Sequence, residues 1–167
     1  MTDPSHVGAE PGAHVSGAEP QTGAAGADPR PLHTLEFRLS FGECDPAGIV
    51  YYATYLEWAE RVHGEWWFLQ GRPIGDPDVG PSFVVRHVSC DYQAAPRPND
   101  VLSVAMSLQR IGDTSFTLSF RFTMVATGAT AGELWLTAVF VDDDMEPAPV
   151  PDDARALLQG GGPGRGR

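Results

Sequence analysis

The feature that most constrains this chain of 167 residues is a single long helical pattern followed only by strand-like patterns. From about Tyr51 to Gly71, apolar residues recur at helical spacing on more than one stripe of the helix. They are Tyr51, Tyr52, Tyr55, Leu56, Trp58, Ala59, Val62, Trp66, Trp67 and Leu69. A helix with so much apolar surface is enclosed in a folded protein. The rest of the chain must therefore supply a sheet that covers it.

Strand patterns lie on both sides of this helix. Before it, residues 34–41 alternate between apolar and polar side chains. After it, strands are predicted at Phe83–Tyr92, Val101–Arg110, Ser115–Met124 and Leu134–Val141, and a short helix at Asp152–Leu158. This order indicates an α+β fold, with one long helix packed on a five-stranded, mainly antiparallel sheet. The last four strands are expected to follow one another as in a meander.

The length is that of one domain, and 42% hydrophobic with 20% charged residues is typical of a soluble globular protein. Residues 1–30 are rich in Gly, Ala and Pro and predict a disordered tail. We assign residues 31–158 to the folded domain and residues 159–167 to a disordered C-terminus. No apolar run approaches the roughly 20 residues that span a bilayer, so no membrane association is expected.

The formal net charge of −11 and the absence of lysine exclude several functions. The chain has no basic footprint for nucleic acid or anionic membrane, and it cannot form a lysine Schiff base. The histidines show no metal-ligand spacing and no Gly-rich phosphate loop is present, so no cofactor or metal is expected. Two cysteines are too few for a disulfide framework, which favours the cytoplasm.

The loop before the long helix carries a carboxylate, Asp45. Pro46 and Gly48 end the preceding strand, and the helical pattern starts within a few residues. Free N–H groups and the positive end of the helix dipole can hold a negative oxygen there while a carboxylate attacks a substrate or activates water. Gly48 suits such a site because it permits a tight turn and a close approach of substrate to the backbone.

The segment Asp45–Tyr55 resembles the signature of the hot-dog fold acyl-CoA thioesterases, in particular the 4-hydroxybenzoyl-CoA thioesterase family, which is related to the tol-pal-associated acyl-CoA thioesterase. The pattern is Asp-x-x-Gly, then Ile or Val, Val, an aromatic residue, three residues of any type and a second aromatic residue. Residues 83–86, 99–102 and 112–116 are similar to later landmarks of the family. The resemblance covers roughly residues 34–151.

This resemblance implies an active site at the interface of a homodimer or homotetramer. It implies that Asp45 is the catalytic carboxylate and that the backbone N–H of Tyr52 polarises the thioester carbonyl. It also implies that substrate is bound by Gly48, Ile49, Val50 and Tyr51, with Glu60 approaching a hydroxyl on the acyl ring. For Glu60 the alternative is a solvated helix face.

The chemistry of the residues agrees with a thioesterase. A thioester is attacked more readily than an ester, so an aspartate of ordinary pKa, about 3.9, can act as nucleophile without a histidine. The same carboxylate can instead act as general base on water, and both routes stay open. The tol-pal branch has a histidine where this chain has Tyr52, so no histidine-assisted mechanism is expected.

The carrier of the acyl group is left open. The family tends to place basic residues at the turn between the third and fourth strands, where this chain has Gly112 and Asp113. Arg86, Arg97 and Arg110 are the substitutes for binding CoA phosphates; otherwise the carrier is a phosphopantetheinyl protein. Arg86 lies on an otherwise apolar strand register, which indicates either a pocket arginine or a β-bulge.

The expected activity is hydrolysis of an acyl thioester with an aromatic or polyketide-like acyl group. Two alternatives remain: an enoyl-thioester hydratase or dehydratase, and a non-catalytic acyl-thioester binding subunit. For His63 we expect a core or surface role rather than catalysis, and for Cys44 a packed thiol rather than a nucleophile.

Overall fold

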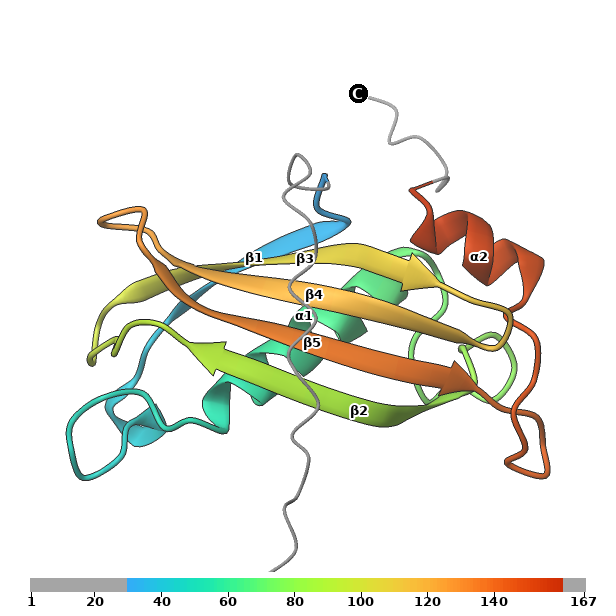
Figure 1. Ribbon diagram of the computed structural model, residues 1–167, viewed down its shortest axis with the longest axis horizontal. Helices are drawn as coiled ribbons and strands as arrows, with labels where there is room; N and C mark the ends of the chain where they lie inside the picture. The colour runs from blue at the N-terminus through green and yellow to red at the C-terminus, as the bar shows by residue number, and fades with distance from the viewer. Residues whose placement is uncertain (1–29, 161–167) are drawn as a thin grey trace, which may run out of the picture.

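The computed structural model describes residues 30–160, which form one long helix on a five-stranded sheet (Figure 1). The elements are β1 (His33–Arg38), η1 (Phe41–Glu43), α1 (Thr54–Leu69), β2 (Phe83–Tyr92), β3 (Val101–Ile111), β4 (Ser115–Met124), β5 (Thr130–Phe140) and α2 (Asp152–Leu158). The predicted α+β class, the number of strands and the short C-terminal helix are thereby confirmed. The predictions of a disordered tail over 1–30 and a disordered end over 159–167 concern residues that lie almost entirely outside the described range.

The strand order is β1-β3-β4-β5-β2, and every pairing is antiparallel. Strands β3, β4 and β5 form a meander, but β2 pairs with β5 at the opposite edge from β1. The expectation that the last four strands follow one another in space was therefore wrong for β2. Alternation with a period of two predicts which side chains share a face, but it does not identify a strand's neighbours.

Helix α1 lies across one face of the sheet (Figure 1) and supplies the three largest fully buried side chains among the described residues. Its buried aromatic side chains are Tyr55, Trp58, Trp66 and Trp67, and each is at most 4% exposed. They pack against side chains of the three central strands, among them Met106, Phe116, Leu118, Phe120, Phe122 and Leu134. Burying one such side chain contributes about 1.5–3 kcal/mol, so this contact dominates the stability of the fold.

Three details of the predicted pattern differ in the structure. The helix begins at Thr54 rather than near Tyr51, and β1 ends at Arg38, which leaves Phe41 83% exposed. Leu56 and Leu69 of α1 are also exposed. The sheet covers only one side of the helix, so part of the predicted apolar face remains at the surface of a single chain.

Gly132 of β5 lies against the ring of Tyr55, near the start of α1. A Cβ atom at this position would lie 2.8 Å from the carbonyl oxygen of Asp91 and 3.1 Å from the ring of Tyr55. The Tyr55 hydroxyl also donates to the neighbouring carbonyl of Ala131 at 3.4 Å. Because Gly132 has no side chain, the Tyr55 ring can pack directly against the β5 backbone. This contact fixes the start of α1 against the sheet.

His63 is a buried residue of α1 and not part of an open site. Its Nε2 accepts a hydrogen bond of 2.8 Å from the Trp67 indole, one turn further along the helix. Burial lowers the pKa of His63 to about 4, so the imidazole is neutral in the folded protein. The expectation of a core role is confirmed. Within residues 30–160, no helix is long and apolar enough to cross a membrane.

We predict that this histidine makes the protein less stable in mild acid. Between its ordinary pKa of 6.5 and about 4, the unfolded chain binds a proton that the folded protein does not. The free energy of unfolding should therefore fall as the pH drops through this range, by about 3 kcal/mol in all from this group. Urea unfolding at several pH values measures the slope. His63→Gln keeps an acceptor for Trp67 and should show a shallower slope; an equal slope would contradict the prediction.

Candidate active site

The Asp45 loop is a closed turn held by its own backbone. Cys44 and Val50 form an antiparallel bridge at its base, and the Asp45 N–H donates to the Ile49 carbonyl at 2.9 Å. The Gly48 N–H donates to the Asp45 carbonyl, also at 2.9 Å, and Gly48 has φ +74°. That conformation costs a residue with a side chain free energy, which explains the glycine in the signature.

The Asp45 carboxylate faces a small hollow. One carboxylate oxygen, Oδ1, accepts the Ala47 N–H at 2.8 Å, and no other hydrogen bond to this carboxylate occurs among residues 30–160. The hollow, here called the acid hollow, has a volume of about 150 Å³. It is lined by Asp45, Ile49, Val50, Tyr52, Tyr55, Tyr92, Ala94 and Ala95. The second carboxylate oxygen is therefore available to a molecule bound there.

The backbone N–H of Tyr52 is also uncommitted. The Tyr51 N–H donates to the Glu43 carbonyl at 2.8 Å, and the Thr54 N–H donates to the Tyr51 carbonyl at 2.9 Å. Between them, the Tyr52 N–H has no acceptor among the described residues. Tyr52 lies in the turn just before α1 rather than inside the helix, close to the positive end of the helix dipole. An uncommitted donor here can stabilise a developing negative oxygen.

Glu43 ties the Asp45 loop to the helix, a role that the sequence analysis missed. Its carboxylate accepts the Ser40 N–H and hydroxyl, both at 2.7 Å, and the Trp58 indole N–H at 3.0 Å. Burial would raise the pKa of Glu43, but these hydrogen bonds and nearby Arg61 outweigh it and leave the pKa lowered. The Ser-x-x-Glu spacing of residues 40–43 is a capping-box signal that could have identified the contact of Glu43 with Ser40, but not its contact with Trp58.

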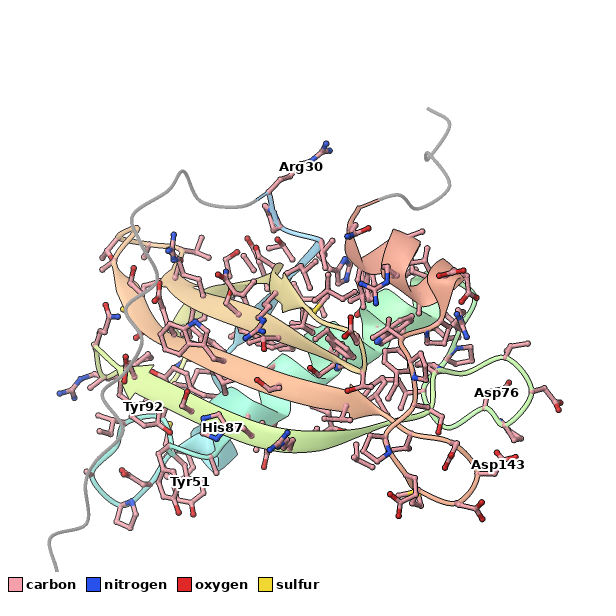
Figure 2. The ribbon with its side chains drawn as sticks, turned by 45° about the vertical axis from the view of Figure 1, so that its right-hand side comes forward. Arg30, Tyr51, Asp76, His87, Tyr92 and Asp143 are labelled. Carbon is pink, nitrogen blue, oxygen red and sulfur yellow. The ribbon has the colours of Figure 1, made fainter. Side chains whose placement is uncertain are left out.

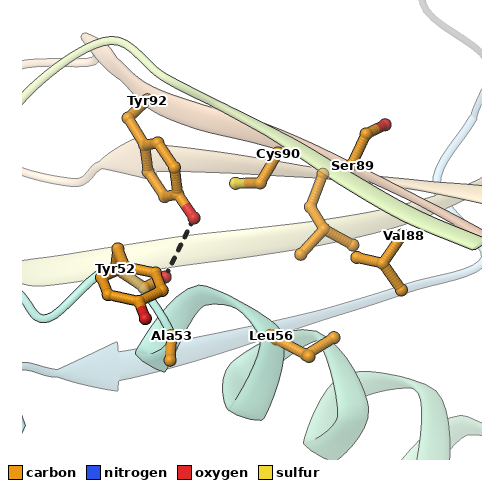
Figure 3. Close-up of a pocket in the computed structure, with 8 residues that line it drawn as sticks. Tyr52, Ala53, Leu56, Val88, Ser89, Cys90 and Tyr92 are labelled. Atoms are coloured by element: carbon orange, nitrogen blue, oxygen red, sulfur yellow. Dashed lines mark hydrogen bonds between the residues drawn. The ribbon is translucent and has the colours of Figure 1, made fainter.

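A second hollow opens between α1 and β2, next to the acid hollow (Figure 3). Here called the apolar hollow, it has a volume of about 220 Å³. It is lined by Tyr52, Ala53, Leu56, Val88, Ser89, Cys90, Tyr92 and Leu134. The Tyr92 hydroxyl donates to the Tyr52 carbonyl at 3.2 Å. Burial raises the pKa of Tyr92 to about 12, with a contribution from Cys90, so this hydroxyl keeps its proton at neutral pH.

The structure brings part of the predicted site together. Asp45, Ile49, Val50 and Tyr52 line the acid hollow, and Gly48 shapes the loop that holds them. The Tyr51 ring lies against the Tyr52 ring, with centroids 4.5 Å apart, and it lines neither hollow. Tyr51 and Tyr92 lie near one end of the molecule, away from the loops that carry Asp76 and Asp143 (Figure 2).

Three predicted residues lie apart from this cluster in a single chain. Glu60 is exposed on α1 and lines neither hollow. Arg86 is the extra residue where the β2–β5 register shifts between Val85 and His87, so the bulge expected as one alternative is present and the side chain is exposed. Arg110 lies near the far end of β3, roughly 30 Å from its start at about 3.3 Å per residue. Their roles in substrate binding stay predictions.

The chain is similar to known thioesterases and to an esterase. The model of the family described as the thioesterase superfamily matches residues 47–125. A candidate esterase of Aquifex aeolicus (strain VF5) is 30% identical over 84 residues, which cover 50% of this chain and 66% of the relative. The 1,4-dihydroxy-2-naphthoyl-CoA hydrolase of Synechococcus sp. (strain RCC307) is 25% identical over 131 residues, which cover 72% of this chain and 96% of that enzyme.

A solved structure agrees with these relatives in fold. A mutant 4-hydroxybenzoyl-CoA thioesterase in complex with 4-hydroxybenzoyl-CoA superposes with a TM-score of 0.67 at 21% identity. The superposition covers 75% of this chain and 96% of that chain. The expected hot-dog fold is thereby confirmed. The family match and the named relatives confirm the family resemblance and support the expected enzyme class of thioester hydrolase.

The Glu43 contacts predict an effect on both stability and catalysis. Glu43→Gln removes the charge from three hydrogen bonds, each of which contributes about 1.5–3 kcal/mol when charged. We expect a loss of about 1–3 kcal/mol in the free energy of unfolding and a lower kcat, because the Asp45 loop loses its tie to Trp58. Chemical denaturation and steady-state kinetics measure the two effects. As a control, Glu36→Gln changes an exposed carboxylate on β1 and should leave both values within error; equal effects of the two variants would contradict the role of Glu43.

Proposed function

We propose that this chain, whose residues 47–125 match the thioesterase superfamily, hydrolyses an acyl-CoA thioester with the carboxylate of Asp45. One observation carries the proposal: the Asp45 carboxylate and Tyr52, with its uncommitted N–H, border the same hollow. A nucleophile or base on one side and a hydrogen-bond donor on the other are the two groups that acyl transfer needs.

In the proposed reaction, the thioester carbonyl oxygen accepts the Tyr52 N–H. The free oxygen of Asp45 attacks the carbonyl carbon, and the C–S bond breaks to release the thiolate, which takes a proton from water. Water then cleaves the resulting acyl-aspartyl anhydride and regenerates the carboxylate. In the alternative route, Asp45 removes a proton from the water that attacks the thioester directly. Both routes use the same two groups.

The lining of the acid hollow supports an aromatic or polyketide-like acyl group. Three of its eight lining residues are tyrosines, namely Tyr52, Tyr55 and Tyr92. Aromatic walls favour flat apolar rings through stacked and edge-on contacts. The named activity of the Synechococcus relative also concerns an aromatic acyl-CoA.

For the carrier we propose CoA, with Arg97 as a phosphate ligand. Ala95 lines the acid hollow, and the carbonyl of Pro96 accepts the Val50 N–H at 2.9 Å. Arg97 follows directly and is exposed. An arginine beside the mouth of the hollow suits a phosphate group outside it.

For the compartment we propose the cytoplasm. Cys44 and Cys90 are free cysteines, which suits a reducing environment.

The alternative functions have less support. A hydratase on this fold needs a histidine near the start of the helix. Of the described histidines, His33, His63 and His87, none lines either hollow. A binding subunit without turnover would need the same hollows but no reactive carboxylate, so substitution of Asp45 separates it from an enzyme.

We propose that two copies of the chain associate through β2. This edge strand pairs only with β5 among the described residues, and Val84, Val85 and Tyr92 on it are between 37% and 53% exposed. An exposed apolar edge is covered in stable proteins.

We predict that sedimentation will show a dimer or a tetramer. Val85→Lys places a charge on this edge, so the oligomer should dissociate and lose activity. Val125→Lys, in the turn after β4, is the control. A fully active monomer would contradict the proposal.

Substitution of the catalytic carboxylate tests the function directly. Asp45→Asn keeps an acceptor for the Ala47 N–H, so the loop should stay folded. We expect turnover to fall by about 10²–10⁴-fold, measured as free thiol released from benzoyl-CoA, 2-naphthoyl-CoA and the matching acyl-pantetheines. Asp91→Asn, an exposed carboxylate on β2, is the control. Wild-type turnover in Asp45→Asn would refute the role of Asp45, and saturable binding without turnover in the wild type would identify a binding subunit.

A further inference from the structure

The two hollows share the residues that separate them. Tyr52 and Tyr92 line both the acid hollow and the apolar hollow. The hydrogen bond between them, from the Tyr92 hydroxyl to the Tyr52 carbonyl, joins the end of β2 to the turn before α1 (Figure 3). A molecule that filled both hollows would have to pass this contact.

Tyr92 is held in place on more than one side. Its ring meets the Tyr55 ring edge-on, with centroids 5.1 Å apart. Its cross-strand partner on β5 is Gly132, which has no side chain to displace the ring. Yet Tyr92 is 51% exposed and sits at the last position of an edge strand, where the backbone has a partner on only one side. The side chain is therefore placed by a few contacts that a substitution can remove without opening the core.

We propose that Tyr92 determines acyl-group specificity by separating the two hollows, so that the enzyme favours single-ring acyl thioesters over two-ring or long-chain ones. This inference rests on the proposed function. The volumes support it, because a cavity of about 150 Å³ accepts a benzene-sized ring. Neither hollow reaches the roughly 300 Å³ at which pockets for larger ligands begin, but the two together exceed it.

The lining of the apolar hollow indicates what would enter once the barrier is removed. Leu56, Val88 and Leu134 are among its lining residues, and no charged side chain lines it. Such a surface favours hydrocarbon and disfavours a charged or strongly hydrated group. A second ring or an alkyl chain fits this chemistry, whereas a carboxylate-bearing acyl group does not.

The test compares the kcat/KM ratio of 2-naphthoyl-CoA to benzoyl-CoA in the full chain and its variants. Tyr92→Ala removes the wall, and the ratio should rise at least tenfold. Tyr92→Phe keeps the ring but loses the hydrogen bond, and the ratio should rise by less, about threefold. Tyr92→Val replaces Tyr92→Ala if that variant does not fold. Val125→Ala, exposed in the turn after β4, should keep the wild-type ratio.

A binding measurement distinguishes failure of this inference from failure of the proposed function. Calorimetry gives the Kd of the neutral amides 2-naphthamide and benzamide for the wild type and Tyr92→Ala, and it needs no turnover. A rise in relative naphthamide affinity without any wild-type hydrolysis would support the barrier and refute the thioesterase. Wild-type hydrolysis with unchanged ratios of kcat/KM and Kd in Tyr92→Ala would refute the barrier and leave the thioesterase standing.

Discussion

The packing of α1 against one face of the sheet is the contact on which the rest of the structure depends. Four aromatic side chains of the helix are buried there, and the central strands present apolar side chains to them. Two of these rings also position the site. Tyr55 rests on Gly132, and Trp58 binds the Glu43 carboxylate through its indole N–H. The core and the candidate active site are therefore built from the same residues.

Neighbouring backbone groups before the helix differ in whether they are hydrogen-bonded within the chain. The Glu43 carbonyl takes the Tyr51 N–H, and the Tyr51 carbonyl takes the Thr54 N–H. This leaves the Tyr52 N–H uncommitted beside the Asp45 carboxylate, which is itself held through only one oxygen. The hydrogen bonds on either side hold the Tyr52 N–H and the Asp45 carboxylate in place before substrate binds. Groups that are already arranged need little reorganisation during a reaction, which supports the proposed catalysis.

The surface around the candidate site exposes several large apolar side chains in a single chain. Apolar side chains of β2 and the rings of Tyr51 and Tyr52 are exposed, while the aromatic side chains of α1 that face the sheet are buried. A second copy on β2 would bury this surface and enclose both hollows. Arg86 and Arg110 line neither hollow within one chain.

The sequence by itself determined the element types and identified the loop that carries Asp45. Alternating strands, one aromatic helix and the Asp45–Tyr55 signature predicted the fold class, Asp45 and Tyr52, because these signals are local in the chain. The tertiary structure alone decided that β2 lies beside β5, that Glu43 binds Trp58, and that Tyr92 meets Tyr52 across 40 residues of sequence. Periodicity specifies which face a side chain occupies. Which distant segment it faces depends on how the whole sheet curls around the helix, and no local pattern encodes that.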